Sequence, residues 1–327
     1  MTTEEIKLSI IIVSWNVKQE LVDCLRSLEE NPPSFSYEVI TVDNASTDGS
    51  IETLQKDFPS VKLIINKENR GFAAANNVGI KQSRGEHILF LNPDTLVHEG
   101  ALDILINFID KNKDVGACGP KLLNDDGTLQ PSIRKVPNFR ASLYQNTILR
   151  RLGFFRGSYR EYRMLDFDFE KQIDVDVIMG AALLVRHSII KELNGMDEAF
   201  FMYYEEADLC YRVQKSGWRL VFLPDSHITH LGGKSSDQVP VKTKMMRLRS
   251  LLIFFRKHYG KLNTCCFNLV FKPTVLLRYV IDFFSAIVMY ILSLLIMNKN
   301  GQKKYSNKIK YSLSWLQEYA WEFLIRF

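Results

Sequence analysis

Short apolar runs alternate with amphipathic stretches over the first 125 residues. Runs rich in β-branched residues predict buried strands at Leu8–Trp15, Tyr37–Asn44, Val61–Asn66 and His87–Asn92. Apolar positions at helical spacing predict helices between them, at Gln19–Glu30, Ser50–Phe58, Phe72–Ser83 and Glu99–Asn112. Near-continuous apolar strands separated by helices are typical of a parallel sheet covered on both faces. The pattern therefore predicts an α/β fold.

The pattern weakens from Leu122 to Lys171, where polar loops carry many aromatic and arginine residues. It then resumes with four further elements. We expect strands at Val175–Val185 and Trp218–Pro224, and helices at Ser188–Leu193 and from about Glu205 to Lys215.

The chain changes character after about residue 242, which predicts one domain at 1–242 and a helical extension at 243–327. Phe283–Met297 has no charged residue, but these 15 residues fall short of the roughly 20 that a spanning helix needs. Lysines follow at 299, 303, 304, 308 and 310, and one helical face carries Leu313, Leu316, Ala320, Phe323, Leu324 and Phe327. Apolar helices with basic flanks favour an anionic membrane surface. A buried helical cap or a homodimer interface is the alternative.

Polar residues stand where the four N-terminal strands are expected to end. They are Ser14 and Asn16, Asp43 and Asn44, Asn66, and the triplet Asn92-Pro93-Asp94. In parallel α/β sheets, ligands bind outside the carboxyl ends of the strands. These residues therefore predict a ligand site at one edge of the sheet.

Two aspartates at these strand ends allow more than one interpretation. Asp94 offers a carboxylate that can help hold Mg²⁺ or Mn²⁺ beside diphosphate oxygens, and Asp43 can accept hydrogen bonds from a nucleobase. Each aspartate can instead cap the helix that follows it. Asn69–Gly79 similarly places small residues where a helix meets the expected crevice, which fits either ligand contact or close packing on the sheet.

Composition and charge narrow the class of protein. The net charge of +5 is spread along the chain and does not favour nucleic acid as a partner. The five cysteines form no C-x-x-C pair, which argues against a zinc site or a disulfide framework. The N-terminus is acidic, and its apolar run is too short for a signal peptide. We therefore expect a cytoplasmic protein, peripheral on the inner face of the cytoplasmic membrane.

Several motifs in a fixed order carry a resemblance to a known family. They read S-x-x-I-V-S-W-N, V-D-N-A-S-T-D-G-S, N-x-G-F-A-A-A-N-N-x-G, F-L-N-P-D-T, G-A-A-L-L-V-R and Y-x-E-E-x-D-L-C-x-R, followed by G-W and a histidine. This order resembles inverting family 2 glycosyltransferases. It is most similar to the rhamnosyltransferase-like branch that has N-P-D in place of D-x-D. The resemblance covers roughly residues 6–240.

The resemblance implies a GT-A fold, a nucleotide-sugar donor (dTDP-rhamnose or a UDP-hexose) and a divalent cation. It also implies a glycan or lipid-linked acceptor in cell-surface polysaccharide synthesis, with inversion at the anomeric carbon. By position, Asp43 would contact the base and Asp94 the metal. The residues expected to line the donor pocket are Ser14, Asn16, Asn69, Gly71, Asn76, Asn92 and Gly180. Asn92 replaces the first aspartate of the usual metal motif.

The second half of the chain supplies the remaining candidate residues. Glu206 matches the catalytic base, which takes a proton from the acceptor hydroxyl, and Glu205 is the reserve candidate. Considered alone, the two glutamates would be a solvated first helical turn. His230 matches a histidine that holds the metal or the diphosphate, although a lone histidine is usually structural. Lys234 and Ser235 are expected to help hold the diphosphate.

Other functions fit the sequence less well. A nucleotidyltransferase would want a glycine-rich loop after the first strand, and V-S-W-N-V-K-Q-E-L has no glycine. A Rossmann dehydrogenase is excluded because no G-x-G-x-x-G follows a strand. A non-catalytic nucleotide-sugar-binding or assembly scaffold remains the alternative from a different class, although Asp43, Asp94 and Glu206 are all present.

Overall fold

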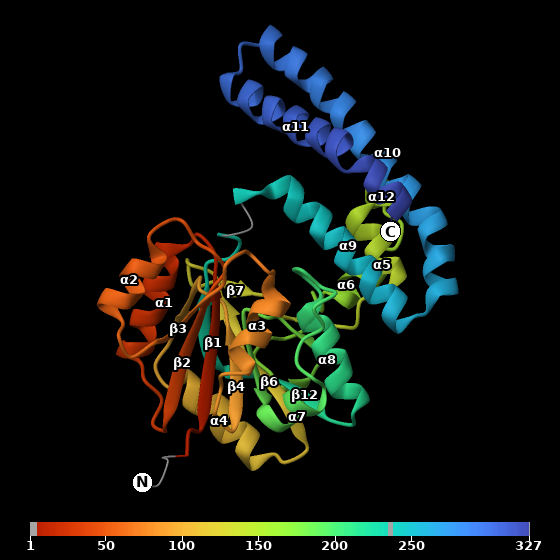
Figure 1. The fold of residues 1–327 in the computed structure, drawn as a ribbon. Coiled ribbons are helices and arrows are strands. Elements are labelled where there is room, and N and C mark those ends of the chain that lie inside the picture. Colours follow the sequence, from red (N-terminus) through yellow and green to blue (C-terminus); the bar gives the residue numbers. More distant parts are fainter. Residues whose placement is uncertain (1–4, 235–237, 327) are drawn as a thin grey trace. The chain divides into compact units, whose positions relative to one another are not determined.

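The computed structural model describes residues 5–234 and 238–326, and the chain divides into two compact units (Figure 1). Unit 1 comprises residues 1–136 and 163–238, and unit 2 comprises residues 137–162 and 239–327. The segment 137–162, which the sequence pattern placed in the first domain, groups with the C-terminal helices. Its Phe139 ring packs on aromatic rings of those helices.

Unit 1 is built on a ten-stranded mixed sheet whose main path runs β3-β2-β1-β4-β11-β6-β12-β5. The first four strands on this path are mutually parallel, as the sequence predicts, whereas β11 is antiparallel to both of its neighbours. The strands of the sheet are β1 (Leu8–Ser14), β2 (Tyr37–Asp43), β3 (Lys62–Ile65), β4 (His87–Leu91), β5 (Thr95–Val97), β6 (Val115–Leu123), β7 (Leu129–Gln130), β9 (Ile173–Asp174), β11 (Ala182–Arg186) and β12 (Arg219–His230).

Helices cover both faces of this sheet (Figure 1). Alternate residues of β1 point to opposite faces, so Ile10 and Ile12 pack with α1 and α4, while Val13 packs with α3. The helices of unit 1 are α1 (Lys18–Glu30), α2 (Ser50–Asp57), α3 (Phe72–Ile80), α4 (Ala101–Lys111), α7 (His187–Glu192) and α8 (Glu205–Lys215).

Two predicted strands differ from the structure. The run Val175–Val185 is not one strand, because it is divided between β10 (Val177–Ile178) and β11. β10 pairs with β8 (Ile133–Arg134) in a separate two-stranded sheet, and the chain turns at Gly180 between them. The strand expected to stop at Pro224 continues as β12 to His230, with a register shift between Leu223 and His227. Apolar content alone predicts neither the turn at Gly180 nor the continuation of β12 beyond Pro224.

Unit 2 is helical. Its aromatic core stacks Phe139 on Phe267 and Phe267 on Phe271, and further along α10 the Tyr279 ring stacks on Trp315 at 3.8 Å between ring centroids. The elements of unit 2 are α5 (Phe139–Asn146), η1 (Ile148–Leu152), α6 (Arg156–Tyr162), α9 (Pro240–His258), α10 (Lys261–Leu295), α11 (Lys299–Glu318) and α12 (Ala320–Arg326).

The expected single amphipathic helix at the end of the chain is not what the structure shows. The chain leaves α11 at Tyr319 and starts α12 at Ala320. Of the predicted apolar face, Leu313 is 37% exposed and Phe323 is fully buried against α10. Trp315, which lies outside the predicted face, is also fully buried against α10. Because indole and phenyl rings bury more apolar area than leucine, they decide which face packs.

Candidate functional site

The parallel strands β1 and β2 end side by side, with Ser14 paired to Asp43 in the register. The Asp43 Oδ1 accepts a hydrogen bond from the Ser46 N–H at 2.9 Å. Its Oδ2 and the Ser14 hydroxyl are buried and have no hydrogen-bond partner among the described residues. Buried polar atoms without partners are costly, so they point to a ligand that completes the site.

Asp43 does not cap the next helix. Helix α2 begins after Gly49, and Asp48 accepts the hydrogen bond from the Ser50 N–H at the start of that helix. The helix-capping interpretation of Asp43 is therefore wrong, and its second carboxylate oxygen stays available at the strand end.

Two asparagines hold the loops around this strand edge. Asn16 has a left-handed backbone (φ 52°), and its side-chain oxygen accepts a hydrogen bond from the Thr47 N–H at 2.8 Å. The Asn44 amide donates to the Asn69 side chain at 3.2 Å and to the Gly71 carbonyl at 3.1 Å. The predicted residues Asn16 and Asn69 thus contribute to the loop structure beside Asp43.

Gly71 lies where the chain enters α3 against the Phe201 backbone. A Cβ at this position would stand 2.3 Å from the Phe201 carbonyl oxygen, and the glycine has φ +82°. Only glycine fits such a close backbone approach. Five residues later, Asn76 is fully buried, and its side-chain oxygen has no partner within the described part of the chain.

Asp94 lies in the turn between β4 and β5 and is 7% exposed. A strand and not a helix follows Asp94, so the interpretation of Asp94 as a helix cap is also wrong. Its Oδ1 lies 3.3 Å from the Nε2 of His230, at the end of β12. The Asn92 side-chain nitrogen lies 3.4 Å from the same Nε2. The structure therefore brings His230 to two residues from which the sequence separates it by more than a hundred positions.

Gln130, on β7, fixes the proton on the His230 ring. Its side-chain nitrogen donates to the His230 backbone carbonyl at 3.0 Å and to the Asn124 side-chain oxygen at 2.9 Å. Because the backbone carbonyl can only accept, the Gln130 oxygen must be the atom 2.7 Å from His230 Nδ1. Nδ1 then carries a proton, so in the neutral imidazole the Nε2 lone pair faces the Asp94 carboxylate. Two facing acceptors at 3.3 Å suit a cation between them.

The two glutamates at the start of α8 are not a solvated acidic turn. Glu205 is 6% exposed and Glu206 is half-buried, and each has a buried Oε2 with no partner in the described chain. Burial raises the pKa of Glu205 well above its usual range, and the nearby charges of Glu206 and Asp208 add to the shift. Glu205 therefore keeps its proton over a wider pH range than an exposed glutamic acid.

Glu206 faces the turn between β10 and β11. A Cβ at Gly180 would stand 3.3 Å from the Glu206 Cβ, so this glycine lets the helix approach closely. Tyr203 and Tyr204, just before α8, both have positive φ angles, of 69° and 67°. Two consecutive non-glycine residues in this region store strain of about 1–3 kcal/mol each, a feature that clusters at functional sites.

Hydrogen bonds connect these groups along the carboxyl edge of the sheet. The Asn92 N–H donates to the Ala181 carbonyl at 2.9 Å, which joins the Asp94 turn to the Gly180 turn. The Phe72 N–H donates to the Phe201 carbonyl at 2.7 Å, which joins α3 to the segment before α8. Lys234 differs from the other predicted residues, because its Nζ lies 3.9 Å from Glu20 on α1. Ser235 lies outside the described residues.

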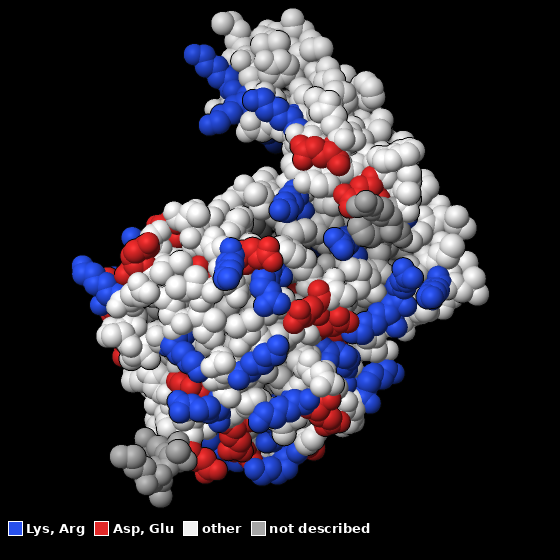
Figure 2. Space-filling view, viewed as in Figure 1, with Lys and Arg blue, Asp and Glu red and all other residues white. Residues whose placement is uncertain are grey.

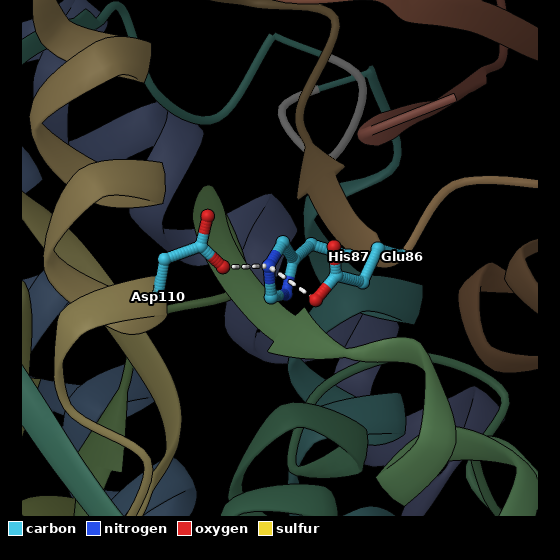
Figure 3. A group of neighbouring side chains, drawn as sticks. All are labelled: Glu86, His87 and Asp110. Carbon is cyan, nitrogen blue, oxygen red and sulfur yellow. Dashed lines mark hydrogen bonds and ion pairs between the residues drawn. The ribbon is translucent and has the colours of Figure 1, made fainter. Parts of the chain in front are cut away.

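A second cluster of titratable groups lies at the opposite, amino end of β4 (Figure 3). His87 Nε2 lies 2.9 Å from Asp110 and 3.8 Å from Glu86. The Lys7 ammonium lies 2.7 Å from the Asp110 carboxylate and 2.6 Å from that of Glu86. Burial lowers the pKa of His87, although Asp110 opposes the shift. Because Lys7 already supplies the positive charge, we interpret this cluster as structural.

Comparison with known proteins identifies the family. The profile of Glycosyl transferase family 2 matches residues 9–192, more than half of the chain. The chain belongs to this family. This family 2 glycosyltransferase is 30% identical to the N-acetylglucosaminyl-diphospho-decaprenol L-rhamnosyltransferase of Mycobacterium tuberculosis, over 77% of its own length and 85% of the relative. It is 26% identical to the rhamnosyltransferase WbbL of Escherichia coli K12, over 68% and 82% of the two chains.

Solved structures share the fold of this glycosyltransferase. The mannosyltransferase PcManGT of Pyrobaculum calidifontis, solved with GDP-Man and Mn²⁺, matches with a TM-score of 0.55 and 17% identity, over 98% of this chain and 88% of that one. GalNAc-T7, solved with UDP, GalNAc and Mn²⁺, matches with a TM-score of 0.52 and 17% identity, over 68% and 43%. The predicted GT-A fold with a helical C-terminal extension is confirmed.

Sequence reasoning missed Gln130, because it lies in the weakly patterned region after Leu122. A usable signal was present in Asn124-Asp125-Asp126-Gly127, since an Asp-Gly pair between extended runs indicates a hairpin. The structure has that hairpin between β6 and β7, and Gln130 follows it. Only the fold, however, brings β7 beside the end of β12.

Replacing Gln130 with methionine is expected to weaken Mn²⁺ binding by about 10- to 100-fold, because His230 loses the acceptor that fixes its tautomer. Isothermal calorimetry would measure the affinity, and ¹⁵N NMR of the His230 ring would report the tautomer. Gln130→Glu keeps an acceptor at Nδ1 and should restore most of the affinity. Unchanged Mn²⁺ affinity and tautomer in Gln130→Met would show that Gln130 is only structural.

Proposed function

We propose that this glycosyltransferase moves a sugar from a nucleotide diphosphate to a hydroxyl of a lipid-linked glycan, with inversion at the anomeric carbon. The observation that carries the proposal is the convergence of three groups on one sheet edge. The first group is the side-chain oxygens of Ser14 and Asp43 that have no hydrogen-bond partner among the described residues. The second is the Asp94–His230 pair, and the third is the Glu206 carboxylate. Each matches one need of the reaction: a base pocket, a diphosphate anchor and a proton acceptor.

In this proposal the donor nucleotide lies over the ends of β1 and β2. The available Asp43 oxygen accepts from the N–H of a pyrimidine ring, and the Ser14 hydroxyl completes the pocket. Asn16 and Asn69 position the loops that frame it. A thymine or uracil base offers the imide N–H that Asp43 needs, which favours dTDP-rhamnose or a UDP-hexose as donor.

Asp94 and the Nε2 of His230 would hold a divalent cation, with Asn92 beside them. A bound cation would stabilise the charge of the departing nucleotide diphosphate. A carboxylate with a neutral imidazole suits Mn²⁺ better than Mg²⁺, and both structural neighbours were solved with Mn²⁺. Only one carboxylate stands in the motif, so the diphosphate itself would supply further oxygens.

Glu206 acts as the base in this reaction. As the acceptor oxygen attacks the anomeric carbon, its proton moves to Glu206, and the bond from that carbon to the diphosphate breaks. Adjacent helical residues diverge by ~100°, so Glu205 points elsewhere and lies buried. While Glu205 keeps its proton, it adds no second negative charge beside the base. Gly180 lets the start of α8 approach the turn between β10 and β11 closely, which helps to hold Glu206 in place.

The substrates named for two relatives support a choice of donor and acceptor for this glycosyltransferase. The M. tuberculosis relative is an L-rhamnosyltransferase that acts on an N-acetylglucosaminyl-diphospho-decaprenol. A poly(ribitol-phosphate) β-glucosyltransferase of Bacillus spizizenii is 34% identical over 45% of this chain and 24% of its own. We therefore propose a rhamnose or hexose donor and a lipid-linked acceptor in cell-surface polysaccharide synthesis.

Calorimetric titration of the full chain with dTDP-rhamnose, UDP-hexoses and GDP-mannose, each with and without Mn²⁺ or Mg²⁺, tests this function. We expect metal-dependent binding of one thymidine or uridine sugar. A folded protein that binds a sugar nucleotide but never releases nucleotide diphosphate with any acceptor would support the non-catalytic scaffold. Failure to bind any of them would remove the donor assignment.

Unit 2 supports attachment to a membrane surface on the cytoplasmic side. The most apolar 18-residue window of α10 has a mean hydropathy of 2.0, and only 17% of it is buried. Its uncharged stretch within the helix, Phe283–Leu295, spans about 20 Å, less than the ~30 Å hydrocarbon core. The neighbouring helix α11 carries exposed lysines, such as Lys303 and Lys304. Figure 2 shows Lys and Arg along one edge of an otherwise mostly uncharged end of unit 2.

These features favour insertion of the α10 end into the interface of an anionic bilayer, with the α11 lysines at the headgroups. Changing Leu295, Ile296 and Met297 together to serine should release the protein from phosphatidylglycerol vesicles in a sedimentation assay. The three side chains are 71–85% exposed, so folding should be unaffected. If the triple variant instead converts a homodimer to monomers in analytical ultracentrifugation and still binds vesicles, this surface is a dimer interface.

A further inference from the structure

A short turn in unit 2 exposes a group of large apolar side chains. It joins η1 to α6, and residues 150–157 are all exposed. Leu152 is 65% exposed, Phe154 is 56% exposed and Phe155 is 37% exposed. Single apolar residues on a protein surface are normal, but three within four positions form a patch, and exposed apolar patches mark interaction sites. We call residues 150–156 the basic–aromatic turn.

The elements on both sides of the basic–aromatic turn are packed into unit 2. The Tyr159 ring of α6 lies 4.9 Å from the Tyr144 ring of α5, measured between centroids, and Tyr162 is buried at the end of α6. Within the turn, Gly153 and Phe155 have φ angles of 76° and 63°. A left-handed backbone is unfavourable for phenylalanine, and strained residues of this kind cluster at functional sites. The fold therefore holds this apolar group in solvent although the backbone there is strained.

Arginines flank the apolar side chains of the turn. Arg150 and Arg151 come before them and Arg156 comes after them, and no acidic residue occurs from position 147 to position 160. The Arg150 guanidinium lies over the Tyr144 ring, 5.9 Å from its centroid. At a membrane surface, aromatic side chains enter the interface while basic side chains stay at the headgroups. An apolar centre with a basic rim therefore matches the surface of an anionic bilayer.

Arg151 connects the turn to the helix that the proposed function places at the membrane. It pairs with Asp282 of α10, and the Lys308 ammonium of α11 lies 3.2 Å from the same carboxylate. Asp282 directly precedes the uncharged stretch Phe283–Leu295. The basic–aromatic turn is therefore fixed to α10 and α11 at the point where this uncharged stretch begins.

We propose that the basic–aromatic turn inserts Leu152 and Phe154 into an anionic bilayer, with Arg150 and Arg156 at the lipid phosphates and Arg151 holding the turn to α10. This membrane contact goes beyond the proposed function, because it lies outside the C-terminal helices and needs no sugar nucleotide. A second copy of the chain fits the turn less well, since two such turns would bring their arginines together and like charges repel. A bilayer covers the apolar centre and neutralises the basic rim at the same time.

Sedimentation of the full chain with vesicles tests the proposal. With equimolar phosphatidylglycerol and phosphatidylcholine at low salt, Leu152→Ser/Phe154→Ser should lower the partition coefficient by at least about tenfold. Both side chains are more than half exposed, so folding should be unaffected, which the melting temperature would check. The control Ile65→Ser/Leu165→Ser removes two apolar side chains that are 49% and 42% exposed in unit 1, and it should bind as the wild type does.

The arginines are tested in the same assay. Arg150→Gln/Arg156→Gln should weaken binding to these vesicles by about 10- to 30-fold, since each basic residue near an anionic surface contributes about fivefold. This loss should disappear at high salt and should be absent with pure phosphatidylcholine vesicles. Arg26→Gln/Lys56→Gln removes two charges from exposed positions of α1 and α2, and this control should bind as the wild type does.

A fluorescent label on the turn would report insertion directly. Cys265 and Cys266 are the exposed cysteines of the described chain, so replacing both with serine leaves Phe154→Cys as the accessible thiol. An NBD label at this position should gain fluorescence and shift to the blue on the vesicles, and spin-labelled lipids in the bilayer should quench it. The same label at Leu165→Cys should show neither change.

Three results would overturn the proposal. Unchanged vesicle binding of Leu152→Ser/Phe154→Ser would leave the turn as a contact for another protein. An equal loss in the Ile65→Ser/Leu165→Ser control would show that the turn has no particular part in binding. A label at position 154 that stays in water on bound vesicles would place the membrane contact at α10 alone.

The turn and the end of α10 should act independently. Leu295 lies about 20 Å along the helix from Asp282, so the losses of binding free energy from the turn variant and from the triple variant of α10 should add. Donor binding with Mn²⁺, measured separately, should be unchanged in the turn variants. Absence of donor binding in the wild type would count against the proposed function and leave this membrane contact standing.

Discussion

Replacing Glu206 with glutamine is expected to slow sugar transfer by about 10²- to 10⁴-fold while leaving donor affinity unchanged. Glutamine keeps the shape of the side chain beside Gly180 but cannot take a proton from the acceptor hydroxyl. The proposed donor contacts at Asp43 and Asp94 lie on other elements and should not change. Single-turnover transfer assays, paired with calorimetry of the donor in the presence of Mn²⁺, would separate the chemical step from binding.

Glu205→Gln is the matched comparison, since it changes the adjacent carboxyl by the same atoms. We expect transfer within about tenfold of the wild type, because Glu205 is buried. The raised pKa of Glu205 means that folding favours its protonated form, so its ionisation costs stability as pH rises. Glutamine avoids that cost, and the variant should be more stable at high pH. If Glu205→Gln abolishes transfer and Glu206→Gln does not, the base is Glu205.

Periodicity predicted β1 to β4 and α1 to α4 of unit 1, but it missed β5 and β6. The ends of β1, β2 and β4 fall within one residue of the prediction, because the apolar runs stop where the polar side chains of the candidate site begin. Helix α8 was predicted from Glu205 to Lys215, the bounds found in the structure, since Gly217 marks its end. Local sequence signals therefore predict both elements and the edge at which the site forms.

What the sequence could not predict are contacts between distant segments. Gln130 and His230 are separated by 100 positions, and no spacing rule links them. The burial of Glu205 depends on how α8 packs, which a two-residue acidic pattern does not reveal. The hydrogen bonds from Lys244 to Asn146 and from Arg278 to Gln145 depend on α5, α9 and α10 meeting in unit 2. Contacts between residues far apart in the sequence determine the protonation state of a side chain, and these contacts cannot be read from its sequence position.

Replacing Asp94 with asparagine is expected to lower metal-dependent donor affinity by about a hundredfold or more, since changes even outside the first shell of metal ligands cost 10- to 100-fold. The change removes the negative charge of the proposed cation ligand with almost no change of shape. Calorimetry of the donor with Mn²⁺ would measure the loss. Asp126→Asn, in the exposed turn before β7, removes the same charge away from the site and should have no effect.

Without metal, the same Asp94→Asn change should stabilise the protein. In wild-type protein, the Asp94 oxygen faces the lone pair of His230 Nε2 at 3.3 Å, an unfavourable pair unless a cation or proton lies between them. The side-chain amide introduced by Asp94→Asn would instead donate to Nε2, so the variant should melt at a higher temperature without metal. Saturating Mn²⁺, at about 100 times its dissociation constant, should stabilise the wild type by about 2.7 kcal/mol and the variant far less. Retained Mn²⁺ stabilisation in Asp94→Asn would place the cation at other residues and leave Asp94 as a structural partner of His230.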